Sequence, residues 1–583
     1  MDKTWFEMHD LRKRKFDKSV WIPLHACQYK INEGKYGFTG YKCEVFCVGS
    51  VLLPVKEKDN AKDINWCDLG LIYTQGSYVE NNEYYPADHF SDNENNMSGI
   101  LPVIVQKTLD DTLPPWLLNQ DIMIALRLKN EKDRWVSPEN GYEEAIRVKR
   151  NAEGKEEILE IKANYLKDYL CARNMFLYIT SYSERKVIID DVSNITWNEG
   201  ENRYYSDYER WEGRIAPIHE GGNPFGQSAM VMQVRRTDVD DDDDMPSLSD
   251  PPTNDNTEGE SWEKKFHGRK LFFVSGELWY NELIIPGLNS SIVRRDKLPS
   301  TNYFIIDAQN SKINGDELID SGKWLWFKPD IIMALSNQRN FSLEFFTKDT
   351  GSVCCLYGYS IHFGVNEIGL INVYAKDIGL LPDWMQKIWA GYNTVPEGGV
   401  SKELLAIQVH VKELDSQAPE SFIESGIDYV NSLAQEKFGI NIFKKHKEFS
   451  NIANKTHRFR SLDEQSFFSL AKDIARLSAD SLDIDSMRKY LNMTKEERLG
   501  SIKTLEKLLS EKYGEENSKK ITKVLVGIYE LRLADAHLPS SEIEEAYNKL
   551  QVDRTLPFVH QGYQLLYEFV SCIYFIADVI KKW

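Results

Sequence analysis

The hydrophobic periodicity changes at residue 401, and this change most constrains the fold. Before it, apolar and aromatic residues form short runs, such as 41–53 and 341–346, separated by glycine, asparagine and aspartate. Such runs are typical of β-strands. After it, apolar residues recur every three or four positions, as in 423–438 and 465–477, which predicts amphipathic helices. We therefore expect an α+β multidomain protein with a β-rich N-terminal region and an all-α C-terminal bundle.

An acidic, polar tract interrupts the β-rich region. Residues 238–244 are all aspartate except for one valine, and almost nothing apolar follows before residue 262. Like-charge runs of this kind repel themselves and have no apolar surface to bury. We predict four segments, which are a β-rich domain (1–236), a flexible linker or insertion (237–262), a second β-rich segment (263–400) and a helical domain (401–583). Whether the tract separates two domains or interrupts one stays open.

Three local patterns in the β-rich part make sharper predictions. The spacing of tyrosines and leucines predicts a short helix at residues 163–174. The runs 175–182 and 186–189 are predicted to pair as a hairpin. Asp383 and Gln386 stand three residues apart before apolar residues, which indicates a capping box at a helix start.

The net charge of −19 belongs to the N-terminal part of the chain. Residues 1–420 carry 47 Lys and Arg against 66 Asp and Glu, whereas residues 421–583 carry 24 of each. An acidic surface repels polyanions, so the N-terminal region is a poor candidate for non-specific nucleic-acid binding. If the protein handles RNA, the helical region should do so.

The cysteines and the hydropathy indicate a soluble cytoplasmic protein. The eight cysteines are scattered without a C-x-x-C pair, which argues against zinc and suits a reducing compartment. The N-terminus has no basic segment followed by an apolar run, so we expect no signal peptide. The most apolar run, 569–580, is about a dozen residues long and contains Asp578, so we expect a buried helix. No metal or cofactor is predicted.

A motif near the C-terminus carries the functional prediction. Apolar residues at helical spacing lead to Arg532, and His537 follows just before a Leu-Pro pair that should end the helix. Residues five apart point about 140° away from each other on a regular helix. If the helix unwinds before Pro539, His537 is free to turn towards Arg532. A guanidinium clamps phosphate oxygens and an imidazole moves protons near neutral pH, a pairing suited to phosphodiester cleavage.

The sequence Arg532-Leu-Ala-Asp-Ala-His537 within a helical domain resembles the R-x4–6-H motif of the HEPN superfamily, which includes many metal-independent RNases. A long β-rich region before such a domain is similar to the layout of ApeA-type phage-defence proteins. Position 533 is leucine, where the family usually has a polar residue, and Asp535 would supply that polarity instead.

The resemblance implies a mechanism and partners. His537 would act as general acid and base for attack of the ribose 2′-hydroxyl on the adjacent phosphate. Arg532 would stabilise the developing charge, Asp535 would orient the pair, and Tyr529 would contact the RNA. Two copies would form one composite site through a homodimer or a higher homo-oligomer. The β-rich region would act as sensor or regulator, with a phage-derived protein as a candidate trigger.

A basic segment of the same region is the candidate RNA-binding element. Residues 443–460 hold six Lys and Arg against one acidic residue, with three phenylalanines between them. Cations for phosphates and aromatic rings for bases suit single-stranded nucleic acid. The candidate RNA contacts are Lys444, Lys445, Arg458 and Arg460. An ordinary solvated loop is the simpler interpretation.

Other interpretations stay open. Arg532 and Asp535 would form a surface ion pair at i, i+3, and His537 would act as a cation at a helix C-terminus. Aromatic residues of the second β-rich segment either line a ligand groove or fill a core. These are Trp279, Trp324, Trp326, Phe327, Trp384 and Trp389. The alternative function is a non-catalytic protein whose β-region binds a protein or glycan and whose helices oligomerise. A nucleotide-binding but inactive HEPN domain also fits Leu533.

Overall fold

The chain folds into two compact units, residues 1–298 and 299–583, in a computed structural model. For residues 31–32, 228–236, 257–265, 534–537 and 540 the structure describes the backbone but not the side chains. The described residues are 2–70, 76–80, 82–92, 97–105, 115–198, 200–223, 228–236, 257–265, 268–494, 497, 499–537 and 540–583.

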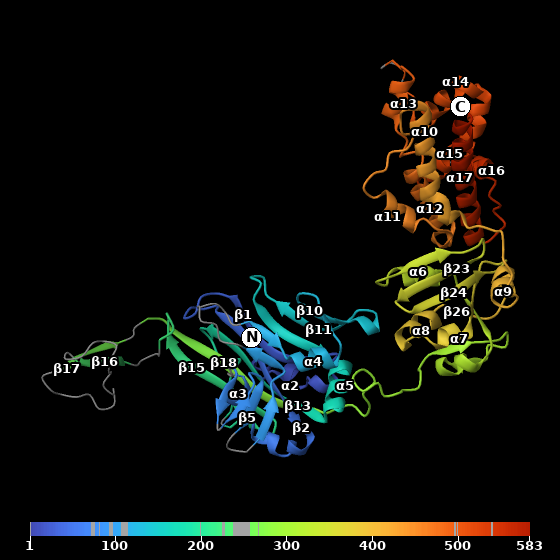
Figure 1. Cartoon of the computed structure of the whole chain (residues 1–583). Helices are drawn as coiled ribbons and strands as arrows, with labels where there is room; N and C mark the ends of the chain where they lie inside the picture. The colour runs from blue at the N-terminus through green and yellow to red at the C-terminus, as the bar shows by residue number, and fades with distance from the viewer. Residues whose placement is uncertain are drawn as a thin grey trace. The chain divides into compact units, whose positions relative to one another are not determined.

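The first unit is built on one antiparallel sheet, whose main path runs β14-β15-β18-β13-β2-β1-β12-β11-β10-β9 (Figure 1). Its long central strands are β2 (Lys42–Pro54), β13 (Met175–Ile189) and β18 (Lys270–Ile284). Strand β13 pairs along its length with β2 and with β18. The other strands of the main path are β1 (Trp21–Glu33), β9 (Lys129–Asn130), β10 (Arg134–Ser137), β11 (Glu143–Arg150), β12 (Glu156–Lys162), β14 (Arg203–Tyr205) and β15 (Glu209–His219).

Short helices cover this sheet and bury its apolar residues. Helix α5 (Ala163–Arg173) confirms the helix predicted at 163–174, and it places four fully buried side chains in the core. These are Tyr165, Leu166, Tyr169 and Leu170. Helix α4 (Gln120–Ala125) adds Ile122 to the same core. At the N-terminus, α1 (Lys3–Phe6) lies so close to β18 that a Cβ on Gly276 would stand 2.1 Å from the carbonyl oxygen of Phe6.

One sequence prediction for this unit is wrong, and one question left open by the sequence is answered. Residues 175–189 form the single strand β13 rather than a hairpin, because the stretch between the two apolar runs lacks the Gly, Asn or Pro of a tight turn. The question left open at the acidic tract is answered, because β18 pairs with β15 in the same sheet and the tract therefore does not separate two domains. The segment between these strands is an insertion carrying the hairpin β16 (Ser228–Arg236) and β17 (Thr257–Lys265). The acidic run 238–244 lies outside the described residues.

The second unit begins with a six-stranded sheet in the order β22-β23-β24-β25-β21-β26. Its strands are β21 (Trp324–Phe327), β22 (Ser342–Phe345), β23 (Thr350–Leu356), β24 (Tyr359–Val365), β25 (Ile371–Tyr374) and β26 (Asn393–Thr394). Helices α6 (Asp330–Ser336), α7 (Ala375–Gly379) and α8 (Asp383–Ala390) pack their buried residues into its core.

Two of the aromatic residues considered for a ligand groove fill the core. Phe327 and Trp389 are fully buried and lie edge to face, with ring centroids 4.8 Å apart. Trp324, Trp326 and Trp384 are partly buried, as is Trp279 of the first unit. The predicted capping box is wrong, because α8 begins at Asp383 itself and Gln386 instead donates to the backbone carbonyls of residues 379 and 381.

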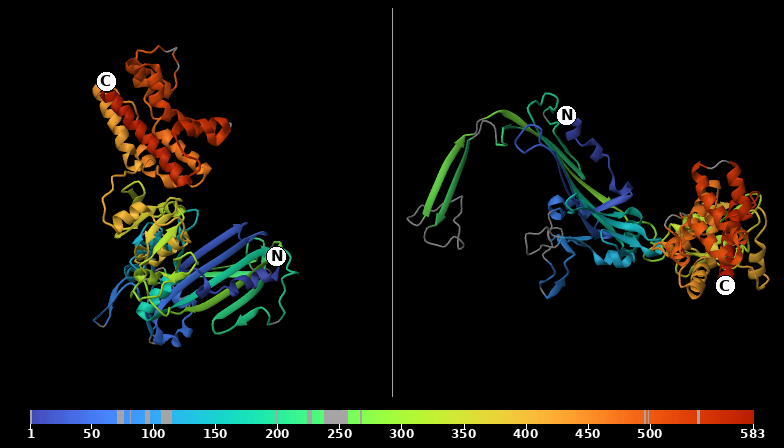
Figure 2. Two further views of the ribbon diagram at one scale, coloured as in Figure 1. Left: turned by 90° about the vertical axis from the view of Figure 1, so that its right-hand side faces the viewer. Right: turned by 90° about the horizontal axis from the view of Figure 1, so that it is seen from above.

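A helical bundle completes the second unit, and its apolar faces meet in one core (Figure 1). Its main helices are α10 (Ile423–Phe438), α12 (Glu464–Leu477), α14 (Ser501–Tyr513), α15 (Glu515–His537), α16 (Ser540–Leu550) and α17 (Phe558–Lys581). Shorter ones are α11 (Phe449–Lys455) and α13 (Ile484–Tyr490), whereas α9 (Lys402–Gln408) contacts β24 of the sheet. Figure 2 shows α10 alongside α17. The predicted α+β class with a helical C-terminal region is confirmed.

Helix α17 is the central apolar helix of this bundle. Among the described residues it alone is long and apolar enough to cross a membrane, yet 56% of its most apolar window is buried inside the unit. The prediction of a buried helix at its apolar run is therefore confirmed. Phe459 and Val559 belong to the core of the six-stranded sheet, so sheet and bundle pack as one unit rather than as separate domains divided at residue 400.

Candidate functional site

Helix α15 positions the predicted arginine at the bundle surface. Ile521, Leu525, Ile528 and Leu531 are buried along one face, as the helical spacing predicts. Arg532 follows the last of them at the edge of that face. The helix is regular as far as His537, and α16 begins at Ser540. Leu538 and Pro539, where unwinding was expected, lie outside the described residues, as do the side chains of Asp535 and His537.

The guanidinium of Arg532 is held in place without being buried. It forms an ion pair with Asp480, and the side chains of Arg532 and Asp480 are 31% and 33% exposed. Its Cζ lies 5.5 Å from the ring centroid of Tyr529, one turn earlier on the helix. Leu533, beside the arginine, is 44% exposed. A partly exposed arginine whose partner is a surface carboxylate can exchange that carboxylate for a phosphate at small cost.

The structure reassigns much of the predicted RNA-binding segment. The Lys444 ammonium pairs with Asp483 at 3.0 Å and with Asp485 at 3.3 Å. Lys445 pairs with two carboxylates of α10, those of Glu424 and Asp428, and Arg460 pairs with Asp473 of α12. The three cations remain partly exposed, but neighbouring carboxylates already neutralise them. Their contribution to phosphate binding stays a prediction.

Arg458 is a structural cation, which corrects its prediction as an RNA contact. Its side chain is fully buried and donates to both carboxylate oxygens of Glu420, at 2.7 and 2.8 Å. A third bond of 2.5 Å runs to the carbonyl oxygen of Lys348. The rings of Phe345 and Tyr563 flank the guanidinium, with centroids 4.9 and 4.5 Å away. No face of Arg458 is open to RNA.

The phenylalanines of the segment are also buried. Phe443, Phe449 and Phe459 have at most 1% of their surface exposed. The ring of Phe459 stacks on Phe345 of the sheet, with centroids 5.9 Å apart. Stacking on RNA bases, as predicted from the alternation of cations and aromatic rings, is therefore excluded in this structure. The segment joins the bundle to the sheet.

Burial of His457 in this segment predicts an acid-sensitive fold. Burial is the main cause that lowers its pKa to about 4, and the opposing effect of Glu420 is countered by the nearby cations Arg460 and Arg458. Below pH 6.5 the imidazole of His457 takes up a proton in the unfolded chain but stays neutral in the folded chain. We expect stability to fall by roughly 3 kcal/mol as the pH drops from 6.5 towards 4. Urea unfolding followed by circular dichroism measures it, and His457→Gln should flatten this slope. Burial also lowers the pKa of His25 in the first unit to about 4, but His25 is present in both the wild type and His457→Gln and so does not affect the difference between their slopes.

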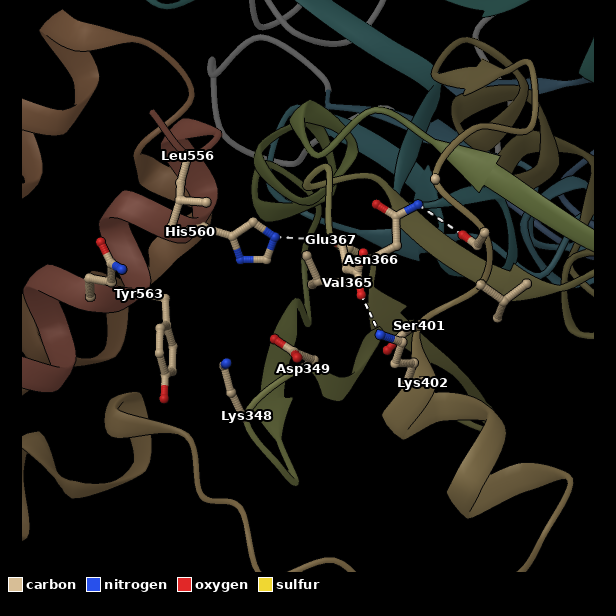
Figure 3. Close-up of a pocket in the computed structure, with 14 residues that line it drawn as sticks. Lys348, Asp349, Val365, Asn366, Glu367, Ser401, Lys402, Leu556, His560 and Tyr563 are labelled. Carbon is tan, nitrogen blue, oxygen red and sulfur yellow. Dashed lines mark hydrogen bonds and ion pairs between the residues drawn. The ribbon is translucent and has the colours of Figure 1, made fainter. Parts of the chain in front are cut away.

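A cavity of about 570 Å³ lies beside this junction, within the second unit. Glu367 and Lys402 line it as an exposed ion pair, and four more titratable side chains line it from the turn before β23 and from the first turns of α17 (Figure 3). These four are Lys348, Asp349, His560 and Tyr563. The volume falls within the range of small-molecule sites, about 300–1,000 Å³. The sequence analysis did not find it, because some two hundred residues separate the two strand-turn residues from the two on α17.

The cavity offers both donors and acceptors. His560 Nε2 lies 2.8 Å from the carbonyl oxygen of Asn366, so this nitrogen carries the proton and Nδ1 of the neutral ring is an acceptor. Burial raises the pKa of Asp349, and among the described residues its Oδ1 has no hydrogen-bond partner. Burial raises the pKa of Tyr563 to about 12, which keeps its hydroxyl a donor at neutral pH. The Lys348 ammonium lies 5.3 Å from the Tyr563 ring centroid. Such a site suits a polar ligand with complementary groups.

Within the part of the chain that the structure describes, no three His, Cys, Asp or Glu side chains lie together as metal ligands would. Comparisons with protein-family models, with curated proteins and with solved structures gave no match.

Proposed function

We propose that the protein is a metal-independent RNA endonuclease that acts in the cytoplasm in abortive-infection defence. The observation that carries the proposal is the position of Arg532, on a bundle surface one turn before the end of α15 and paired, among the described side chains, with a partly exposed carboxylate. The R-x4-H spacing to His537 and the HEPN resemblance supply the chemistry. A structural arginine would be expected to sit as Arg458 does, enclosed by its partners.

The proposed reaction needs two groups near one phosphate, and a composite site of two copies of the motif supplies them, since Arg532 and His537 of one regular helix point about 140° apart. His537 takes the proton from the ribose 2′-hydroxyl, the 2′-oxygen attacks the adjacent phosphorus, and the 5′-oxygen leaves with a proton. Arg532 binds the non-bridging oxygens as negative charge builds on them. Asp535 orients the pair and Tyr529 contacts the RNA. The products are a 2′,3′-cyclic phosphate and a 5′-hydroxyl.

The partner proposals rest on the resemblance and on charge. A homodimer or higher homo-oligomer through the helical bundle brings two motifs together, and the acidic β-rich unit acts as sensor or regulator, with a phage-derived protein as the trigger. Because the first 420 residues carry the whole net charge of −19, the RNA is expected to approach the helical end. The alternative, an aromatic-rich β-surface that binds a protein or glycan, draws less support now that Phe327 and Trp389 are core residues.

The test is incubation of the purified full chain with total cellular RNA in EDTA. We expect the wild type to cleave and to leave cyclic-phosphate ends, which a ligase specific for such ends detects. His537→Ala should lower the rate by about 10²–10⁴-fold, the usual contribution of a general acid–base group. The matched control is His410→Ala, an exposed histidine of the same unit outside the motif, which should cleave like the wild type.

A repeat with extract from phage-infected cells supplies a trigger if the purified protein is silent. Equal cleavage by wild type and His537→Ala would remove the motif from the mechanism. Absence of cleavage with and without infected-cell extract would overturn the nuclease proposal.

A further inference from the structure

Two cysteines of the first unit face each other across neighbouring strands. Cys27 of β1 is the direct partner of Cys47 of β2 in the antiparallel register. Directly opposed residues point to the same face of a sheet, and here the two Sγ atoms are 4.0 Å apart. Cys27 is partly exposed and Cys47 is buried. One cysteine is thus partly accessible to solvent, and its neighbour across the strands is buried.

The contact between the two sulfurs also divides their roles. Cys47 donates its S–H to the sulfur of Cys27, and this hydrogen bond, reinforced by the charge of Lys155, lowers the pKa of Cys27 to about 7. The same contact and burial raise the pKa of Cys47. The thiolate is the nucleophilic form of cysteine, so the accessible member of the pair is also the reactive one at neutral pH.

We propose that Cys27 and Cys47 form a peroxide-reactive dithiol, in which Cys27 is the attacking thiol and Cys47 the resolving thiol. This site is independent of the nuclease motif. Opposed residues of an antiparallel pair have Cα atoms about 4.5–5.5 Å apart, within the roughly 4.4–6.8 Å that a disulfide accepts. The bond therefore needs rotation of the two side chains and no rearrangement of the strands.

The reaction balances with a hydroperoxide as oxidant. The Cys27 thiolate attacks one peroxide oxygen, the O–O bond breaks, and the leaving hydroxide is protonated to water. Cys27 is then a sulfenic acid. Cys47 attacks its sulfur, the S–S bond forms, and the S–O bond breaks with loss of a second water. Two thiols lose two electrons and two protons, and hydrogen peroxide becomes two molecules of water.

The experiment treats the intact chain with a small excess of hydrogen peroxide, blocks free thiols and maps the peptides by mass spectrometry. We expect one linked peptide pair joining Cys27 to Cys47, lighter by two hydrogens and lost on reduction. Because the thiolate fraction of Cys27 falls, the rate should drop about five-fold between pH 7 and pH 6.

Variants separate the two roles. Cys47→Ala, chosen because the site is buried, should leave Cys27 as a sulfenic acid that dimedone traps, whereas Cys27→Ser should leave Cys47 unmodified. Cys67→Ser removes an exposed cysteine of the same unit and should not change the cross-link. Faster oxidation of Cys67 than of Cys27, or a peroxide-treated wild type without the Cys27–Cys47 link, would overturn the proposal.

Discussion

Replacing Arg458 by methionine should destabilise the second unit by about 3–5 kcal/mol, the cost of breaking a buried ion pair from one side. The change leaves the Glu420 carboxylate, itself buried, without its two guanidinium bonds. Burial alone raises the pKa of Glu420, but the charge and hydrogen bonds of Arg458 outweigh that effect and the pKa is lowered. Without Arg458 the buried carboxylate must therefore take up a proton or remain charged without a partner.

The loss of stability should be confined to the second unit, since the residues that contact the Arg458 guanidinium lie there. Glu420 precedes α10, Lys348 lies in the turn before β23, and Tyr563 belongs to α17. Hydrogen–deuterium exchange of α10 and α17 peptides reads this unit separately from the first, because slowly exchanging core amides report its opening free energy. Exchange of β13 peptides should stay unchanged.

The control variant leaves no unpaired charge at this buried position. Arg458→Met combined with Glu420→Leu removes both charges, and we expect it to recover most of the lost stability, since apolar replacement of a whole buried pair is often neutral. A single variant that lost less than about 1 kcal/mol would contradict the structural role of the pair.

The helices were more predictable than the strands, for a physical reason. A helix buries a face defined by its own local spacing, so residues 423–438 were predicted with the bounds that α10 has. A strand is defined by partners elsewhere in the chain. The pairing of β15 with β18 joins residues on either side of a long insertion, and no local pattern shows that the two belong to one sheet. For the same reason the sequence left open whether the acidic tract separates two domains.

The same limit applies to the candidate sites. The sequence of residues 443–460 shows which side chains are cations and which are aromatic rings, but not whether each one points into the core or towards solvent. Arg458 faces inwards because Glu420, 38 residues earlier, supplies a buried carboxylate. Arg532 is a different case, since its position at the edge of the buried face follows from the spacing of apolar residues on its own helix. Its partner Asp480 was not foreseen, because it comes from the turn after α12.

Arg532→Ala should lower RNA cleavage by about 10²–10³-fold, the cost typical of removing one donor to a developing oxyanion. The structure makes this loss separable from unfolding. The Arg532–Asp480 pair is about one third exposed on both sides, and such pairs contribute about 0–1 kcal/mol to stability. Single-turnover cleavage in EDTA gives the rate, and the unfolding midpoint of the same preparation shows that the fold is intact.

Three variants complete the argument for Arg532. Arg532→Lys keeps the charge without the planar fork that binds two phosphate oxygens, so it should recover only part of the rate. Asp480→Asn removes the carboxylate that a phosphate must displace, and RNA binding should tighten rather than weaken. Lys520→Ala removes an exposed cation on the same helix, paired among the described residues with Glu516, and should leave cleavage unchanged. If Lys520→Ala and Arg532→Ala lose activity alike, the helix contributes general charge and Arg532 has no specific role at the phosphate.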